Sequence, residues 1–183
     1  CKRLSPYADL VNINTDGVAF IPHSDDYLRV WKDWEKEFNL TLEEDEFDIF
    51  IQRDVNNYVA KKGDIVVCKG GDVNRYSEDA IFRNNNARIL DIALVDKLLY
   101  NKDILDTLME NLDKPYLYQY ILQAGSTYKG TFDNNGVQHE KVNRVFASKE
   151  KGFFLYKKRQ DDGMVRFPDA PNDMLLWNED CDK

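Results

Sequence analysis

The hydrophobic period of the chain changes twice, and no other feature constrains the possible folds as strongly. Before about residue 79, apolar and polar residues alternate in short runs bounded by turn residues, which is typical of β-strands. Between residues 81 and 109 apolar residues recur at helical spacing instead, and Pro115 ends this run. Short strand patterns follow, at 116–123, 142–147, 153–157 and 175–177. We therefore predict an α+β fold with a sheet-rich part over residues 1–78 and a helix-led part over residues 79–183.

The first alternating runs predict a hairpin. Residues 8–14 and 18–21 form its two strands, and Pro22 stops the second. Between them, Thr15-Asp16-Gly17 is a turn sequence in which we expect Gly17 to supply a positive φ. The pattern therefore places an acidic side chain at the tip of a hairpin.

A helix is predicted over about residues 25–38. Ser24-Asp25-Asp26 offers N-cap side chains, and bulky apolar residues follow at helical spacing. We expect this stripe to pack on a sheet, and a cofactor-binding face is the less favoured interpretation. An extended and very acidic stretch follows at 40–51, and the runs at 55–60 and 65–69 predict a second hairpin.

Charge is distributed unevenly along the chain. The 183 residues include 33 Asp and Glu against 25 Lys and Arg, a net charge of −8. Residues 1–60 hold 13 of the acids and 6 of the bases, whereas residues 140–160 hold seven bases and two acids. This arrangement fits a metal site near a phosphate-binding surface, and it also fits a solvated surface with scattered charges. Charge alone favours the second interpretation.

Several classes of protein are not supported by the sequence. No run of about 18 apolar residues is present, so we predict no transmembrane helix, and no secretory signal pattern occurs. Cys1, Cys68 and Cys181 are widely spaced and include no C-x-x-C pair, which argues against a disulfide framework and against a zinc site. These features predict a protein of a reducing compartment that has no membrane partner.

Four segments in succession resemble the motifs of one enzyme family. Asn14-Thr15-Asp16-Gly17, between two strands, resembles motif C of family B DNA polymerases, usually Tyr-x-Asp-Thr-Asp-Ser at the tip of a palm hairpin. Leu40–Glu43 resembles the acidic Leu-Glu-Leu-Glu stretch of the family, Arg53–Ala60 its Lys-x-Tyr motif, and Cys68–Asp72 its Lys-Gly-x-Glu segment. Lys141–Ser148 also resembles phrases in phage members. The chain as a whole resembles the C-terminal part of a phage-type family B DNA polymerase.

This resemblance implies a fold, an activity and partners. The fold would be the C-terminal half of a polymerase palm at residues 1–78, an antiparallel sheet with a packed helix, followed by a thumb subdomain at residues 79–183. The activity would be template-directed transfer of a nucleotide from a dNTP to the 3′-hydroxyl of a primer, in the cytoplasm of a bacterial host. These residues lack motif A, the fingers and the exonuclease motifs. The resemblance therefore implies an N-terminal polymerase half as partner, without which the fragment is inactive.

The resemblance also implies a site for two Mg²⁺ ions that is shared with this N-terminal half. Asp16 matches the second aspartate of Asp-Thr-Asp, the catalytic metal ligand, whereas Asn14 replaces the first. Glu43 is a further candidate ligand in the acidic stretch. A solvated acidic edge is the alternative interpretation of Glu43–Glu46.

Contacts with primer–template DNA are implied near the primer terminus. A tyrosine and a lysine there can read duplex shape from the minor groove and neutralise phosphate. Tyr58 as a core residue and Arg53 as an ordinary surface base fit the sequence about as well. The implied residues, with Asn56 in place of the lysine of the family, are Arg53, Asn56, Tyr58, Lys69 and Gly70.

The basic run Lys141–Arg159 would give the thumb a grip on the duplex backbone that does not depend on base sequence. Its candidate phosphate ligands are Lys141, Arg144 and Lys149. A binding module of a different class is the alternative function: an acidic α+β inhibitor that mimics nucleic acid with residues 43–48. The basic run and the Asn-Thr-Asp-Gly hairpin count against it, because a mimic needs neither.

Overall fold

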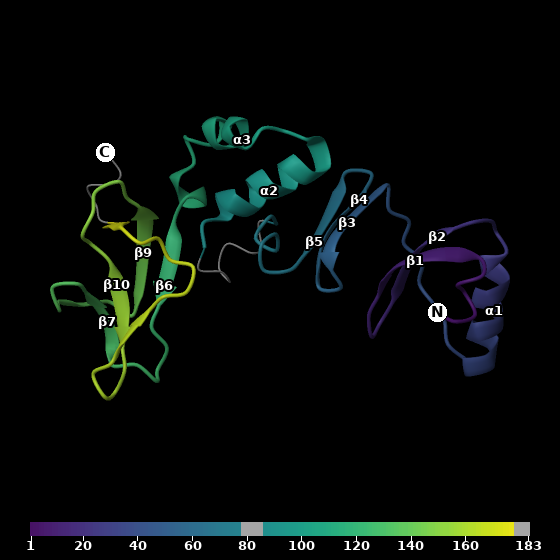
Figure 1. Cartoon of the computed structure of the whole chain (residues 1–183), viewed down its shortest axis with the longest axis horizontal. Coiled ribbons are helices and arrows are strands. Elements are labelled where there is room, and N and C mark those ends of the chain that lie inside the picture. Colours follow the sequence, from purple (N-terminus) through teal and green to yellow (C-terminus); the bar gives the residue numbers. More distant parts are fainter. Residues whose placement is uncertain (78–85, 178–183) are drawn as a thin grey trace. The chain divides into compact units, whose positions relative to one another are not determined.

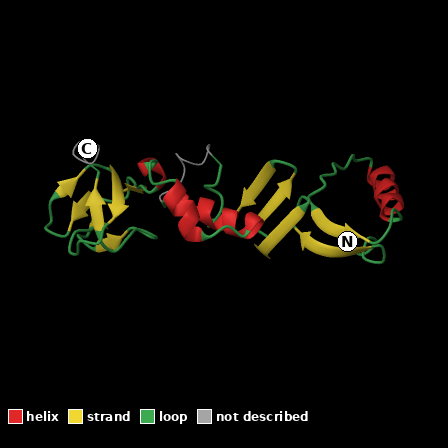
Figure 2. Cartoon of the chain, turned by 90° about the horizontal axis from the view of Figure 1, so that it is seen from above, coloured by secondary structure: helices red, strands yellow, loops and turns green. Residues whose placement is uncertain are grey.

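A computed structural model describes residues 1–77 and 86–177, and the chain divides into two compact units, Cys1–Gly70 and Gly71–Lys183 (Figure 1). The described residues form an α+β fold with three α-helices, one short 3₁₀ helix and four antiparallel sheets (Figure 2). The α+β class predicted from the hydrophobic periods is therefore confirmed. The predicted boundary between residues 78 and 79, like Cys181, lies outside the described residues.

Two small sheets and one helix make up the first unit. The strands β1 and β2 form a hairpin with a bulge between Leu10 and Asn12, and β3, β4 and β5 form a meander in that order. Both predicted hairpins are present. The elements are β1 (Ala8–Ile13), β2 (Val18–Pro22), α1 (Tyr27–Phe38), β3 (Ile49–Asp54), β4 (Asn57–Lys62) and β5 (Ile65–Lys69).

Helix α1 ends where the sequence predicts, because Asn39 adopts a left-handed conformation (φ 52°) and its N–H donates to the Glu35 carbonyl. Its aromatic stripe is less covered than expected. No residue of α1 is fully buried, and Phe38 is 52% exposed. Tyr27 meets Phe20 of β2 edge to face, with ring centroids 5.2 Å apart. Helix α1 therefore contacts the sheet through Tyr27, as predicted, but most of its aromatic stripe is not buried. A two-stranded hairpin is too narrow to cover a whole helix face.

The second unit begins with helices and ends with two sheets. Its strands pair in the orders β12-β9-β6 and β11-β10-β7-β8, all antiparallel. The short strands β7, β8 and β11 were not predicted, because each has only two to four residues and little apolar alternation. The elements are α2 (Arg88–Tyr100), α3 (Ile104–Glu110), η2 (Pro115–Leu117), β6 (Tyr120–Gln123), β7 (Gly130–Asp133), β8 (Gln138–His139), β9 (Val142–Ala147), β10 (Leu155–Lys158), β11 (Met164–Arg166) and β12 (Met174–Leu176).

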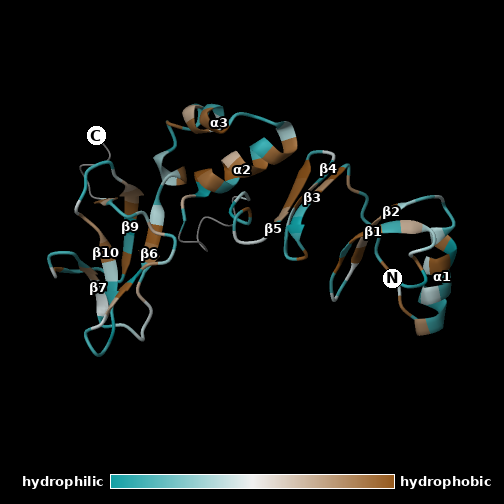
Figure 3. Ribbon diagram, viewed as in Figure 1, coloured by the Kyte–Doolittle hydropathy of each residue, from teal (hydrophilic) through white to brown (hydrophobic). Residues whose placement is uncertain are grey.

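A hydrophobic core lies between strands of the two sheets of this unit. Hydrophobic and hydrophilic segments alternate along these strands (Figure 3), as expected for sheets with one covered face. The buried side chains come from β6, β9, β10 and β12 together with the loop after β11, and they are Leu122, Val145, Leu155, Met174 and Phe167.

An ion pair holds the start of the second unit to helix α2. The Asp91 carboxylate is fully buried and accepts hydrogen bonds from the backbone N–H and the guanidinium of Arg75. Burial raises the pKa of Asp91, and the Arg75 hydrogen bonds oppose that rise. Arg88 donates to the carbonyls of Arg75 and Tyr76, which attaches the same loop at a second point. Among the described residues no helix is long and apolar enough to cross a membrane.

Candidate metal and nucleic-acid site

The tip of the β1–β2 hairpin is closed by the side chain of Asn14. Its amide oxygen accepts from the backbone N–H groups of Asp16 and Gly17, at 2.9 and 2.7 Å. The backbone N–H of Asn14 also donates to the Gly17 carbonyl. Gly17 is therefore not in the positive-φ region, and the expectation that it would be is wrong. The Asn14 side chain makes the turn instead.

Asp16 projects from this tip into solvent. Like Thr15, it is exposed, and its carboxylate makes no hydrogen bond or ion pair with any described residue. The Asn14 bond fixes the backbone of Asp16, and the carboxylate oxygens remain available, as a hard cation requires. The role of Asn14 in this geometry is to orient the turn rather than to bind a cation.

Gln52 of β3 links the hairpin to the meander. Its side-chain oxygen accepts from the Asn12 amide at 2.9 Å, and its side-chain nitrogen donates to the Val11 carbonyl at 2.7 Å. Asn12 is buried, although it is polar, and this bond satisfies it. The backbone of Gln52 pairs with Tyr58 on β4. The hairpin that carries Asp16 is thus hydrogen-bonded to the meander that carries Arg53, Tyr58 and Lys69.

Tyr58 and Lys69 lie side by side on this meander. They are direct cross-strand partners, and the Lys69 ammonium is 5.9 Å from the centre of the Tyr58 ring. The ring of Phe50 stacks on Tyr58 with a centroid distance of 5.0 Å. Tyr58 is half-buried and Lys69 is exposed. The structure therefore brings these two predicted residues together. Tyr58 is also partly packed, which agrees in part with its alternative interpretation as a core residue.

Arg53 lies near the end of β3 and Asn56 lies in the tight turn between β3 and β4, and both are exposed. Asp54 organises this turn, since its carboxylate accepts from the Asn57 amide at 2.7 and 2.8 Å and from the Asn56 backbone N–H at 2.9 Å. These bonds, with a weaker one from Arg53, lower the pKa of Asp54. The charge of Arg53 is therefore partly offset at the position where a phosphate contact was predicted.

Packing requires a glycine at position 70. Its φ is +113°, and a Cβ atom would lie 2.2 Å from the Asn57 amide oxygen and 2.9 Å from the Asn57 Cα. The glycine lets the chain leave β5 close against the β3–β4 turn.

The acidic stretch before β3 is attached to its surroundings by several side chains. Glu44 accepts from the Tyr27 hydroxyl, which raises the pKa of that hydroxyl, and Asp45 pairs with Lys62 at 2.9 Å. Glu35 of α1 accepts from the Leu42 N–H at 2.8 Å, and this bond and Lys32 lower the pKa of Glu35 to about 2. Glu43 is exposed and contacts no other described residue through a hydrogen bond or ion pair.

Within residues 1–77 and 86–177, no group of three or more His, Cys, Asp or Glu side chains is placed to hold a metal ion. Asp16 thus fits as one ligand of a metal site, and the described residues do not add two more beside it.

Three predicted phosphate ligands lie on β9 or close to its ends. Arg144 lies on β9, Lys141 precedes it and Lys149 follows it, and all three side chains are exposed. None of the three forms an ion pair with another described residue. They are the type of exposed cations that contact a nucleic-acid backbone.

Gln52 and Asn12 were missed by sequence reasoning, and no local pattern distinguishes them from other polar strand residues. The Asx turn at Asn14, in contrast, is signalled by the asparagine that opens the turn. No protein-family model, no curated protein and no solved structure matches the chain.

Proposed function

We propose that the chain is the C-terminal palm and thumb part of a phage-type family B DNA polymerase. The observation that carries this proposal is the hydrogen-bonded link through Gln52 between the Asp16 hairpin and the Tyr58–Lys69 pair. The resemblance to family B polymerases implies that both segments work at the same primer terminus. The Asp16 hairpin would bind the metal, and the Tyr58–Lys69 pair would contact the duplex. A physical connection between them supports that common task.

Asp16 would hold Mg²⁺ together with carboxylates from the N-terminal half. Two such ions stabilise the attacking and leaving oxygens of an in-line phosphoryl displacement. The contribution of this chain is a carboxylate on a hairpin tip whose backbone is fixed by the Asn14 side chain. Glu43, exposed on the acidic stretch, is the further candidate for this metal site.

The duplex would be held by contacts that do not depend on base sequence. Tyr58 presents a ring beside the Lys69 ammonium, and Arg144 with its neighbouring lysines presents exposed charge along β9. Together these features would position the primer terminus and the backbone behind it.

Primer extension by separate and combined halves tests the proposal. We expect the 183-residue chain alone to be inactive, because Asp16 cannot hold two ions without a second acid. Coproduced with an N-terminal half that carries motif A and the fingers, it should extend a primer in the presence of Mg²⁺ and dNTPs. Robust Mg²⁺-dependent extension by the lone chain, or no extension by the combined halves, would contradict the proposal.

An acidic inhibitor that mimics nucleic acid is the second candidate. Such a mimic needs free carboxylates along residues 43–48. Glu44, Asp45 and Asp48 already contact Tyr27, Lys62 and the Gly63 N–H, respectively, so fewer charges remain for a partner. Adding the chain to an unrelated polymerase separates the two functions, since a mimic would reduce primer extension by that polymerase.

A further inference from the structure

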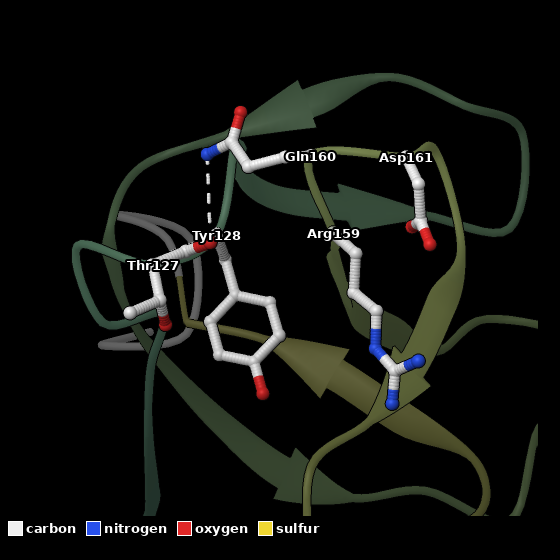
Figure 4. Close-up of a pocket in the computed structure, with 5 residues that line it drawn as sticks. All are labelled: Thr127, Tyr128, Arg159, Gln160 and Asp161. Atoms are coloured by element: carbon white, nitrogen blue, oxygen red, sulfur yellow. Dashed lines mark hydrogen bonds between the residues drawn. The ribbon is translucent and has the colours of Figure 1, made fainter.

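A shallow pocket of about 400 Å³ lies in the second unit between two loops. One wall is the connection from β6 to β7 and the other is the turn from β10 to β11. Thr127 and Gln160 join the walls, since the Gln160 amide donates to the Thr127 carbonyl at 3.4 Å (Figure 4). The backbone N–H of Lys129 also donates to the Lys158 carbonyl, at 2.8 Å. The pocket is therefore formed by segments that are bonded to each other.

Tyr128 forms an aromatic side of this pocket. The ammonium of Lys157 lies 4.7 Å from the centre of the Tyr128 ring and 5.3 Å from the centre of the Phe167 ring. Phe167 is buried in the core, so the Lys157 contact connects the Tyr128 ring to a fixed point. The ring is thus held in position at the pocket, which lowers the entropic cost of stacking on it.

Arg159 supplies the charge of the pocket. Lys129 and Lys158 both pair with Asp162, at 2.9 and 3.0 Å, and so are partly neutralised. Arg159 is exposed and pairs with no carboxylate among the described residues. Figure 4 shows its side chain and that of Tyr128 extending in the same direction from the two walls. The carboxylate of Asp161 is used locally, because it accepts from the Gly163 N–H at 3.0 Å.

We propose that this pocket binds one unpaired nucleotide of single-stranded DNA, with the base against Tyr128 and its phosphate on Arg159. A fixed aromatic ring beside an unpaired guanidinium matches the two parts of a nucleotide, since bases stack on tyrosine and guanidinium groups bind phosphate oxygens in a fork. The volume lies within the range of small-molecule sites. A base within a duplex cannot enter a pocket, which selects the single strand. The choice of DNA as ligand rests on the proposed function.

Fluorescence anisotropy of the full chain tests this inference. The probes are a labelled oligothymidylate of about 12 nucleotides, within the usual site sizes for single strands, and a labelled duplex of the same length. Tyr128→Ala should weaken binding of the single strand by about 5- to 150-fold, the effect of one stacked base, and leave duplex binding within about twofold. Tyr128→Phe keeps the ring and should bind as the wild type does.

Two further variants complete the experiment. Arg159→Gln removes an exposed cation, so folding is preserved, and it should reduce the slope of log affinity against log salt for the single strand by about 0.7. Tyr116→Ala removes an exposed tyrosine from η2, outside the pocket, and should change neither affinity. Urea unfolding of each variant identifies a loss of binding that is caused by a loss of folding.

The inference is overturned if the single strand does not bind, if Tyr128→Ala and Arg159→Gln leave its affinity unchanged, or if both probes lose affinity equally. Should Tyr128→Ala not fold, Arg159→Gln decides, since its salt slope must fall more for the single strand than for the duplex. Failure of the polymerase proposal gives a different result. In that case the combined halves do not extend a primer, whereas the selective effect of Tyr128→Ala on the single strand persists.

Discussion

Two hairpins of this protein place an aspartate beside a turn, and they use it in opposite ways. At the tip of β1–β2, Asp16 is exposed and its carboxylate has no partner among the described residues. At the end of β7, Asp133 is 5% exposed and both its oxygens are occupied. One oxygen accepts from the N–H groups of Asn135 and Val137, each at 2.9 Å, and the other lies 3.1 Å from the His139 ring nitrogen.

The difference comes from the neighbours of each hairpin. Strand β7 lies between β8 and β10, and Leu155 of β10 is the register partner of Asp133. The β1–β2 sheet has only two strands, so no third strand covers its tip. In the first hairpin an asparagine, Asn14, closes the turn and the aspartate stays available. In the second the aspartate closes the turn itself. An acidic turn residue therefore keeps its carboxylate available when another side chain makes the turn.

The largest expected effect concerns the proposed function, primer extension by the chain combined with an N-terminal half. Asp16→Asn keeps the size of the side chain but removes the charge that offsets two divalent cations, so extension should fall by roughly 10³-fold or more. Primer–template affinity should change little, because phosphate contacts provide it. Single-turnover extension and DNA binding measure the two quantities separately. Extension at a rate near that of the wild type would reduce Asp16 to an ordinary turn residue.

Asp133→Ala should instead lower the free energy of unfolding. It leaves two backbone N–H groups and the His139 ring without their acceptor in a covered site, which costs about 1–3 kcal/mol. Urea unfolding monitored by circular dichroism measures this change. Asp16→Asn is the matched control and should stay within about 0.5 kcal/mol of the wild type, as exposed substitutions do. Equal losses in both variants would remove the distinction between the hairpins.

Acid should remove part of the same contribution. Burial acts to raise the pKa of Asp133, but the hydrogen bonds from His139, Val137 and Asn135 outweigh burial and lower it. A lowered pKa in the folded state means that the stabilisation is present above the ordinary value of 3.8 and is lost as the pH falls below it. Unfolding midpoints measured from pH 6 to about pH 3 should thus converge between the wild type and Asp133→Asn. A gap that widens in acid would contradict this assignment.

Asn14→Ala should have a smaller effect on stability. It removes the acceptor for the Asp16 and Gly17 N–H groups, but the tip is exposed and water replaces the bonds, so the cost is about 0.5–1 kcal/mol. Asn14→Asp keeps an oxygen at this position and should retain the stability. Urea unfolding of the two variants measures the difference. Unchanged stability in Asn14→Ala would show that the turn does not depend on the Asn14 side-chain oxygen.

A difference of similar size concerns two turn glycines. Gly136 has a φ of +82°, so Gly136→Ala should cost about 1 kcal/mol although there is space for the methyl group. Gly17 is outside the positive-φ region, and an added Cβ would lie 3.7 Å from the Asn14 amide oxygen, an ordinary contact. Gly17→Ala should therefore be neutral in thermal unfolding. A larger loss of stability in Gly17→Ala than in Gly136→Ala would contradict the assignment of the positive φ to Gly136.

Sequence patterns were sufficient for the elements that depend on local periodicity. The β1–β2 hairpin, the end of α1 at Phe38 and the whole of β9 at Val142–Ala147 follow from alternation or helical spacing, and so does the α+β class. These features are set by residues a few positions apart, whose apolar faces select one backbone period. The acidic side chain at the hairpin tip belongs to the same group.

Only the tertiary structure decided which polar residues meet. Gln52 and Asn12 are 40 positions apart, and Thr127 and Gln160 are 33 apart, so no local period relates them. The same is true of the exposure of Asp16 and the burial of Asp133, because both depend on how many strands lie beside each hairpin. Strand neighbours result from long-range packing, in which each polar group must find a partner or reach water. The sequence by itself therefore determined where strands and helices form, and packing determined which of their side chains remain available for a ligand.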